Sequence, residues 1–523
     1  MININDTFNK ELTADNNRNN VPRQVHEAHF SHVTPRKPSN PKLLHISTEM
    51  LENLGFDKAF AKTETFLNLV SGAEVMDNTE PFAMCYGGHQ FGQWAGQLGD
   101  GRAINLFEIK HHNQRWALQL KGAGATPYSR TADGFAVLRS SIREHLCSEA
   151  MFALGVPTTR SLSLSLTGDE VLRDMLYNGN SAYEKGAVVC RVAPSFIRFG
   201  NFQIFAARKD VDNLRKLTDY TIRHFYPTIE VGTKTGYIEF FKMVTERTLE
   251  MIIHWQRVGF VHGVMNTDNL SILGLTIDFG PYGWLEGYNK GWTPNTTDRQ
   301  HRRYRFGQQI GVGLWNLFQL ANALYPLIED TKPLEAILDN YKSAYAKKYP
   351  AMMRQKLGLM TSLETDAQLI TTLENNLEMV ETDMTIFFRN LSQINKNTLI
   401  NDDSDFLNII REAFYNESEL NEKHISYWRD WFGLYITRLQ KETATNEERQ
   451  NLMNTVNPKY VLRNYMAQMA IDKADNGDYS LIEELHELLK QPYAEQPKYQ
   501  KWFAKRPEWA RHKVGCSMLS CSS

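Results

Sequence analysis

The chain has 523 residues, of which 42% are hydrophobic and 23% are charged, an ordinary composition for a soluble globular protein with more than one lobe. Its 58 basic and 60 acidic side chains nearly cancel, which excludes the strong overall field that draws a protein to nucleic acid or to an anionic membrane. Any anion site must therefore be local, and we expect neither a nucleic-acid partner nor a membrane partner.

The five cysteines form no CxxC pair. Their odd, sparse number argues against the disulfide framework of a small secreted protein. We expect Cys85, Cys147 and Cys190 to be buried thiols. Cys516 and Cys521 lie in a small, polar tail, which we expect to be mobile and accessible.

No segment of the sequence resembles a targeting signal or a membrane span. The first residues lack the apolar stretch of a signal peptide, and they carry acidic residues that disfavour a mitochondrial transit peptide. The most apolar long stretch, Ile310–Ile328, is interrupted by polar residues and by Pro326. These features predict a cytoplasmic protein.

The predicted elements begin with a glycine-rich, β-rich N-terminal half. Residues 1–40 are polar and rich in Asn and Pro, so we expect a loosely packed arm. Alternating apolar residues predict two strands, Ala103–Ile109 and Arg115–Leu120, joined by a polar turn. Helical spacing predicts a helix over 137–154, and a further apolar run predicts a strand at Ala187–Val192.

The second half of the chain is predicted to be mainly helical. The region 210–258 shows helical patterning, and 262–280 is predicted to be a loop and strand segment. Further helices are predicted at 306–325, 334–347, 366–389, 405–415, 425–441 and 458–473. A β-rich half followed by a helical half predicts an α+β protein with two lobes.

Residues 262–280 (HGVMNTDNLSILGLTIDFG) carry the most informative pattern. In protein kinases a loop of the form HRDxxxxN holds a catalytic Asp and a Mg-binding Asn, and a DFG motif follows. His262 and Asn269 keep the kinase spacing, and Asp278 begins a DFG. Val264 stands where a kinase has its catalytic Asp.

Two oxygen ligands and one uncertain base follow from this pattern. Mg²⁺ prefers hard oxygen ligands and often takes only one or two from protein, and Asn269 with Asp278 supplies such a pair. An aliphatic side chain at 264 accepts no proton, so either no strong base is needed or Asp268 takes that role. The alternative is a surface turn followed by a buried strand.

Lys121 ends the second predicted strand, as the phosphate-binding Lys of a kinase does. Glu144 lies in the helix that follows, and a Lys–Glu pair would keep the ammonium charged and aimed at phosphate oxygens. Taken alone, the simpler interpretation is a Lys at a strand end and a Glu on a solvated helix face. Glu144 lies off the apolar stripe of its helix, which suits a surface or a cleft equally.

Glycine-rich turns supply candidate phosphate-binding backbone. The segment Gly96–Arg102 (GQLGDGR) precedes a predicted strand, and its glycines would let backbone N–H groups approach phosphate closely. It matches neither GxGxxG nor a Walker A loop, and a plain β-turn is the alternative. Arg102 adds a guanidinium that could grip phosphate, and Asp133-Gly134 is a second turn candidate at a cleft.

Arg191 and Arg198 lie in an apolar, strand-like stretch. A buried charge without a partner is costly, so each needs either a phosphate or a structural carboxylate. Each candidate is ambiguous alone. Their order along the chain, however, is glycine-rich turn, Lys, Glu, Asn and Asp, and this is the order found in kinases.

Four longer runs closely resemble the selenoprotein O family. They are Tyr86–Ala103 (YGGHQFGQWAGQLGDGRA), Leu120–Arg130 (LKGAGATPYSR), His262–Asn269 and Asp278–Gly283. The resemblance extends from about residue 80 to the C-terminus. It implies a protein-kinase-like bilobal fold, divided as N-terminal arm and helical extension (1–79), N-lobe (80–205), C-lobe with the catalytic and metal-binding loops (206–330) and helical C-terminal region (331–523).

The resemblance also implies an activity. That family, once labelled pseudokinases, transfers AMP or UMP to Ser, Thr or Tyr of proteins from a nucleotide bound in a flipped orientation. The metal would be Mg²⁺ or Mn²⁺ and the nucleotide ATP or UTP. Carried over by motif, Asp268 is the catalytic acid or base, Asn269 and Asp278 bind metal, Glu144 holds Lys121, and the nucleotide contacts are Gly99, Gly101, Arg102, Lys121, Asp133, Gly134, Arg191, Arg198 and Asp278.

The tail carries one further implication. Some members have selenocysteine three residues from the end, where this chain has Cys521. Members can link this tail to the activation loop, but the stretch after DFG, Pro281–Arg305, has no cysteine. A redox role for Cys521, through Cys516 or a mixed disulfide, stays open.

Two other functions stay open on the residues. The chain could be a conventional kinase of proteins or small molecules, or a non-catalytic ATP-binding scaffold that has lost its base. We expect protein substrates as partners and a monomeric enzyme.

Overall fold

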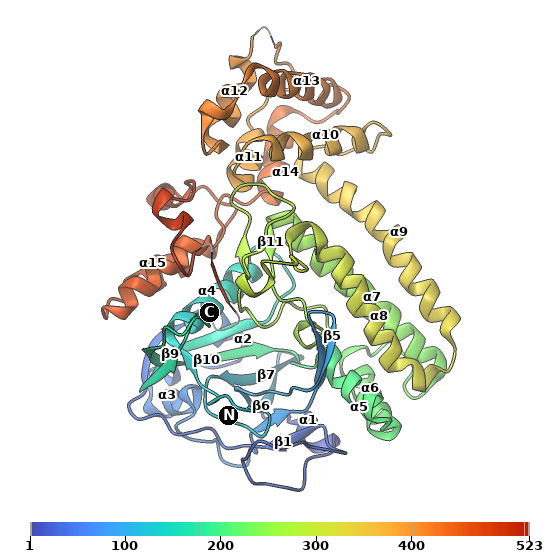
Figure 1. Cartoon of the computed structure of the whole chain (residues 1–523), viewed down its shortest axis with the longest axis vertical. Coiled ribbons are helices and arrows are strands. Elements are labelled where there is room, and N and C mark those ends of the chain that lie inside the picture. Colours follow the sequence, from blue (N-terminus) through green and yellow to red (C-terminus); the bar gives the residue numbers. More distant parts are fainter. Residues whose placement is uncertain (1–2, 176, 401, 517, 521–523) are drawn as a thin grey trace.

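The computed structural model describes residues 3–175, 177–400, 402–516 and 518–520. A β-rich N-terminal lobe occupies the lower left of the view, a helical C-terminal lobe lies to its right, and further helices extend to the top of the view (Figure 1). This is the α+β, kinase-like architecture predicted from the sequence.

One antiparallel sheet forms the N-terminal lobe. Its strands follow the order β1-β3-β6-β7-β10-β9-β2, and β8 pairs with β10. The two predicted strands are present as β6 (Ala103–His111) and β7 (Gln114–Lys121), and the third belongs to a longer β10 (Ala182–Ala193). The remaining strands of this sheet are β1 (Phe30–His32), β2 (Lys42–Ile46), β3 (Phe82–Met84), β8 (Ala136–Val137) and β9 (Arg160–Arg173).

Helix α4 (Leu138–Ala153) covers one face of this sheet, as the helical spacing predicted. Its apolar stripe, which includes Ile142 and Leu146, is buried and packs with β9 and β10. The helices α15 (Asn464–Asp475) and α16 (Ser480–Leu489) pack against α4 as well. Glu144 is therefore buried, although it lies off the apolar stripe.

The N-terminal segment differs from the loosely packed arm that its polar composition predicts. Phe8 and Phe30 are buried, and the Phe8 ring stacks on the Phe82 ring with centroids 5.1 Å apart. Strand β1 pairs with β3 and so extends the sheet. A few apolar side chains are enough to anchor this polar segment, which also contains the short helix α1 (Thr7–Glu11). The short helices α2 (Thr48–Asn53) and α3 (Glu64–Ser71) follow it.

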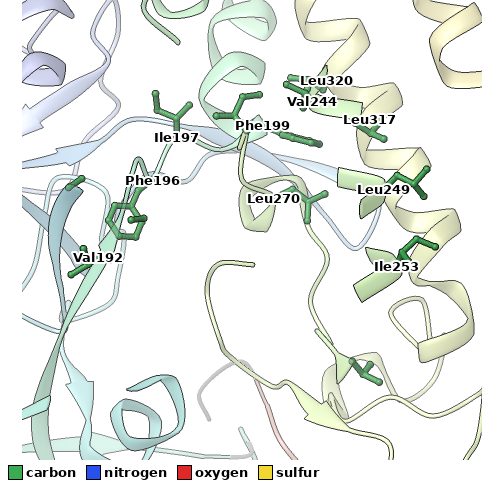
Figure 2. Close-up of a cluster of buried hydrophobic side chains, with 14 of the residues drawn as sticks. Val192, Phe196, Ile197, Phe199, Val244, Leu249, Ile253, Leu270, Leu317 and Leu320 are labelled. Carbon is green, nitrogen blue, oxygen red and sulfur yellow. The ribbon is translucent and has the colours of Figure 1, made fainter. Parts of the chain in front are cut away.

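The C-terminal lobe is built on four helices, α5 (Phe199–Arg208), α6 (Val211–Phe225), α7 (Lys234–Val258) and α8 (Gln309–Ile328). Apolar side chains from α7 and α8 form a buried cluster with the segment before α5 and with Leu270 of the following loop (Figure 2). Between α7 and α8 the chain forms β11 (Phe260–Val261), a short 3₁₀ turn (Thr267–Asn269) and β12 (Gly283–Trp284). Through Leu270, this core holds the 262–280 loop in position.

The strand predicted before Asp278 is reduced to single bridges at Thr276, which pairs with Thr158 and Leu270. A second small sheet, the hairpin of β4 (Gly87–Gln90) and β5 (Gln93–Gln97), lies over the loop from the other lobe.

The rest of the chain is helical, as predicted. The helix predicted over 366–389 is divided at 380–383, because the Asp383 carboxylate caps a new helix by accepting the N–H of Ile386 at 3.0 Å. The helices are α9 (Thr331–Lys356), α10 (Asp366–Met379), α11 (Met384–Leu391), α12 (Ser404–Ile410), α13 (Glu422–Leu439) and α14 (Asn446–Val456), followed by α15 and α16. Among the described residues, no helix combines the length and apolar character needed to cross a bilayer.

The cysteines are largely as predicted, with one exception. Cys85, Cys147 and Cys190 are buried free thiols. Cys516 is also a buried free thiol, contrary to the expected accessible tail. The tail is held because Asn464 Nδ2 donates to the Cys516 carbonyl at 2.7 Å and Thr296 N donates to the Leu519 carbonyl at 2.7 Å. Cys521 lies outside the described residues.

Candidate functional site

A cleft of about 650 Å³ separates the sheet of the N-terminal lobe from the 262–280 loop. Residues of both lobes line it. They include every nucleotide, metal and base candidate derived from the sequence, namely Gly99, Gly101, Arg102, Lys121, Asp133, Gly134, Arg191, Arg198, Asp268, Asn269 and Asp278, together with Val264. Glu144 lies behind this set and reaches the cleft through Lys121.

The predicted Lys–Glu pair is formed. Lys121 lies at the end of β7, opposite Ala103 of β6 and Val189 of β10. Its Nζ is 2.5 Å from Glu144 Oε2 and 3.8 Å from Asp278 Oδ1. Burial lowers the pKa of Lys121, and Glu144 opposes that shift. The carboxylates therefore favour the charged form of the buried amine, which lines the cleft.

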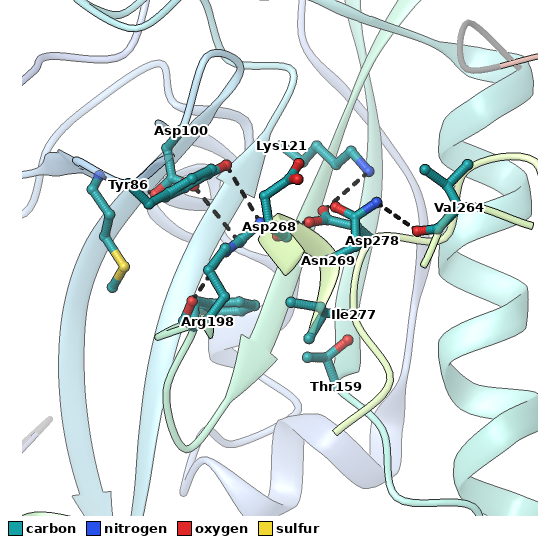
Figure 3. Close-up of polar contacts among 12 residues, drawn as sticks. Tyr86, Asp100, Lys121, Thr159, Arg198, Val264, Asp268, Asn269, Ile277 and Asp278 are labelled. Carbon is teal, nitrogen blue, oxygen red and sulfur yellow. Dashed lines mark hydrogen bonds and ion pairs between the residues drawn. The ribbon is translucent and has the colours of Figure 1, made fainter. Parts of the chain in front are cut away.

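Asp278 is the electrostatic centre of the site. Arg191 Nη1 donates to its Oδ1 at 2.6 Å, and Arg198 Nη1 donates to its Oδ2 at 2.6 Å. Figure 3 shows Arg198, Asp268, Asn269 and Asp278 converging below Lys121. Each arginine thus has a carboxylate partner, one of the two kinds of partner expected from the sequence. Both arginines also line the cleft.

The charge state of Asp278 follows from these contacts. Burial alone would raise the pKa of its carboxyl, but Arg198, Arg191 and Lys121 hold it well below its usual range. Its backbone lies in the left-handed region, with φ of +57°, which is uncommon for a residue other than Gly. The fold therefore presents a permanently ionised carboxylate in a fixed, unusual orientation.

Asn269 is oriented as a metal ligand would be. Its Nδ2 donates to the Val264 carbonyl at 3.0 Å, which directs Oδ1 away from that contact. An amide oxygen and an ionised carboxylate are the hard donors that Mg²⁺ or Mn²⁺ takes from proteins. The donor set of Asn269 and Asp278 thus fits a divalent cation that draws its other ligands from phosphate and water.

Asp268 is the one carboxylate of the 262–280 loop placed to act as a base. It is buried, and its Oδ2 accepts a hydrogen bond from Gln90 Nε2 at 3.2 Å. Its Oδ1 has no hydrogen-bond partner among the described residues. Burial raises the pKa of Asp268 to about 6, near the value that suits a general base at neutral pH. Val264 contributes only an aliphatic wall to the cleft.

Two glycines of the cleft, Gly99 and Gly134, are required by their backbone conformation and by close packing. Gly99 has φ of +75°, and a Cβ there would lie 2.3 Å from Tyr128 Cγ. Gly134 has φ of +77°, and a Cβ there would lie 2.2 Å from the Gly124 carbonyl oxygen. Only glycine fits either position. Asp133, beside Gly134, is paired with Arg173 at 2.7 Å at the cleft edge.

Four residues of the site have no role in the sequence-based prediction. The Arg198 guanidinium lies over the Tyr86 ring, with Cζ 4.6 Å from the ring centroid. Asp100 Oδ1 is 3.7 Å from Arg198 Nη2. Arg191 Nη2 donates to Gln119 Oε1, and Gln90 contacts Asp268. Tyr86, Gln90 and Asp100 all lie in the run Tyr86–Ala103, so the length of that run was the available signal.

Comparison with known proteins agrees with this geometry. A family model described as "Protein adenylyltransferase SelO" matches residues 15–490. A protein of Flavobacterium johnsoniae named protein nucleotidyltransferase YdiU is 60% identical over 522 residues, covering 100% of this chain and 99% of the relative. Proteins of the same name from Rhodopirellula baltica and Azoarcus sp. are 52% and 50% identical, each covering 99% of this chain and 98% of the relative.

The matched region contains both lobes, the cleft and the 262–280 loop, together with most of the helical C-terminal region. The relatives align along essentially their whole length. Fold, site and sequence agree, and the chain belongs to the SelO family of protein adenylyltransferases.

Proposed function

We propose that the protein transfers AMP from ATP to a Ser, Thr or Tyr hydroxyl of another protein and releases pyrophosphate. The observation that carries this proposal is the position of the base. Asp268 presents a buried, unhydrogen-bonded Oδ1 among the described residues, whereas the residue at the kinase base position is Val264. Arg191 and Arg198 in the same cleft add phosphate-binding charge beyond Lys121.

The reaction has a simple balance. The acceptor hydroxyl oxygen attacks the α-phosphorus and a new P–O bond forms. The bond from the α-phosphorus to the bridging oxygen breaks, and pyrophosphate leaves with that electron pair. Asp268 accepts the hydroxyl proton, for which its raised pKa is suited. Lys121, Arg191 and Arg198 would bind the phosphate oxygens and stabilise the charge that develops there.

A divalent cation would be held by Asn269 and Asp278. Bound there, Mg²⁺ or Mn²⁺ would neutralise phosphate charge. Interactions already described favour cation binding. The Val264 carbonyl orients the Asn269 amide, and Lys121 with the two arginines keeps the Asp278 carboxyl ionised. Gly99, Gly101 and Gly134 would admit the nucleotide close to backbone, with Arg102 and Asp133 at the cleft edge.

The experiment that tests the proposal compares ATP labelled at the α-phosphate with ATP labelled at the γ-phosphate. We expect label on protein from the α position only. Label from the γ position only would establish the conventional kinase instead. An unlabelled protein in both cases, with ATP still bound, would establish the scaffold.

Nucleotide choice is tested in the same format. α-Labelled UTP offered in competition with ATP distinguishes UMP transfer from AMP transfer, and substitution of Mn²⁺ for Mg²⁺ identifies the preferred metal. We also propose that the enzyme is cytoplasmic and monomeric. Its nearly balanced charge suits protein substrates rather than nucleic acid. A redox role of Cys521 is testable by comparing Cys521→Ser with the unaltered protein under oxidising and reducing conditions.

A further inference from the structure

An exposed surface leads away from Asp268 along the β4–β5 hairpin. The hairpin is fixed over the catalytic loop, because the N–H of His89 donates to Thr267 Oγ1 at 2.7 Å and Gln90 Nε2 reaches Asp268. At the tip, the N–H of Phe91 donates to the Tyr304 hydroxyl at 2.9 Å. The hairpin therefore joins the base to the activation segment, residues 281–305.

The hairpin tip presents aromatic side chains to solvent. Phe91 is 39% exposed and Trp94 is 40% exposed. The Phe91 ring also contacts the Tyr304 ring, with centroids 5.3 Å apart. A Cβ at Gly92 would lie 3.4 Å from Arg303 Cζ, so the guanidinium of Arg303 borders the tip.

The activation segment beside this tip is strongly basic. Residues 298–305 (DRQHRRYR) contain four arginines and one aspartate, although the whole chain has a net charge of −2. Arg299 and Arg302 are exposed, and within the described part of the chain neither guanidinium has a carboxylate at ion-pair distance. They line a hollow of about 320 Å³ together with Trp292 and Thr296.

The one acidic residue of this stretch does not neutralise the arginines. Asp298 is buried, and its oxygens accept the backbone N–H groups of Arg303 at 2.9 Å and Tyr304 at 2.7 Å. Its carboxylate shapes the segment, while the Arg299 and Arg302 side chains remain exposed. Arg303 itself lies over the Trp315 ring, 4.6 Å from its centroid, which fixes its position.

We infer that Phe91, Trp94, Arg299, Arg302 and Arg303 form the docking surface for the acceptor protein, and that this acceptor platform selects segments with acidic side chains near the acceptor hydroxyl. The inference rests on the proposed function. Unpaired guanidiniums attract carboxylates, and two exposed rings offer apolar contact between them and the base. An acidic segment seated there would deliver a neighbouring hydroxyl towards Asp268.

The test uses the full-length protein, α-labelled ATP and three peptides that share a central Ser. One carries Asp and Glu around the Ser, one carries Asn and Gln, and one carries Lys and Arg. We expect a KM for the acidic peptide about tenfold below that of the amide peptide, with the basic peptide poorest. Added salt should raise the KM of the acidic peptide most, because salt screens exposed charges.

A variant pair locates the effect. Arg299→Glu combined with Arg302→Glu should abolish or reverse the preference, while the KM for ATP and the thermal stability stay unchanged. Lys332→Glu combined with Lys347→Glu, an equal charge change at two exposed positions of α9, should keep the preference.

Equal use of the three peptides by the unaltered protein would overturn the docking inference and leave AMP transfer standing. Preservation of the acidic preference in the double variant would overturn it as well. Absence of α-label on every peptide and protein would overturn both the inference and the proposed function.

Discussion

At the scale of single residues, the proposed mechanism replaces the catalytic carboxylate of a kinase by another that approaches from a different direction. Val264 stands where a kinase base would be, and Asp268 lies four positions later in the same loop, under the β4–β5 hairpin. Its burial raises the pKa to about 6, whereas the arginines hold the pKa of nearby Asp278 well below its usual range. Two carboxylates in one cleft thus have pKa values shifted in opposite directions, which suits the proposed mechanism, in which one takes up a proton and the other stays ionised.

The first prediction concerns pH. A base must be deprotonated to work, so the rate of AMP transfer should fall as the pH drops through about 6, the pKa of Asp268. Asp268→Asn should lose about 100-fold or more in rate and show no acidic limb, with nucleotide affinity retained. Transfer rates measured between pH 5 and pH 8, roughly the range in which such a group titrates, check this. A limb that survives in Asp268→Asn would assign it to another group.

Gln90 provides a second prediction at this scale. Its hydrogen bond lowers the pKa of Asp268 against the effect of burial. Gln90→Ala should therefore move the acidic limb of the pH profile to higher pH, since Gln90 acts as a positioning residue through Asp268. Gln93→Ala, an exposed position on the same hairpin, is the matched control and should leave the limb in place.

At the scale of elements, the glycine-rich turn and the hairpin before it show how backbone conformation and packing restrict which residue a position accepts. Gly96 and Gly99 have nearly the same φ, +74° and +75°. Gly96 has open space around a built Cβ, whereas Gly99 faces the Tyr128 ring, whose hydroxyl lies 2.9 Å from Ser31 Oγ. The two positions therefore separate backbone strain from steric conflict.

The third prediction uses this pair. Gly96→Ala should cost about 1–2 kcal/mol, the strain of a left-handed alanine. Gly99→Ala should cost roughly 1–3 kcal/mol more, because Tyr128 must move, and it should weaken nucleotide binding. Thermal unfolding and nucleotide titration of both variants check this. Equal melting temperatures would show that the Tyr128 ring yields freely.

The elements also show how far the sequence predicts the structure. Strands β6 and β7, helix α4 and the Lys121–Glu144 pair follow from periodicity and from motif order, which are local signals. Gln90 contacts Asp268 across 178 positions of sequence, and no periodicity reports a contact of that kind. The packing of residues 1–40 was missed because their polar composition conceals a few apolar side chains, among them Phe8 and Phe30, that pack the segment against the sheet.

At the scale of the whole molecule, the helical C-terminal region supports the nucleotide site from behind. α15 and α16 pack against α4, the helix that carries Glu144. Leu485 of α16 and Leu146 of α4 belong to the same buried apolar cluster. In addition, Arg143 Nη2 donates to the Tyr282 carbonyl at 2.8 Å, just after DFG. The far end of the chain thus stabilises the position of the Lys121 partner.

The fourth prediction tests this support. Leu485→Ala removes a fully buried side chain and should cost about 2–5 kcal/mol. Amide exchange should rise in α4, and ATP affinity should fall although Leu485 lies outside the cleft lining. Leu434→Ala on α13, where the side chain is 48% exposed, is the control and should change neither. Exchange that rises only in α16 would contradict the coupling.

The contacts of Asp278 have a thermodynamic consequence. Its oxygens are engaged by the same arginines that phosphates would bind, so a metal ion and a triphosphate each compete for one half of an ion pair. A metal ion bound to Asp278 would free the arginines for phosphate, and phosphate bound to the arginines would free Asp278 for the metal. By linkage, each ligand raises the affinity for the other by the same factor. Metal and nucleotide should therefore bind with positive cooperativity. Calorimetry should find tighter Mn²⁺ binding in the presence of a non-hydrolysable ATP analogue, and Mn²⁺ should tighten binding of the analogue by the same factor.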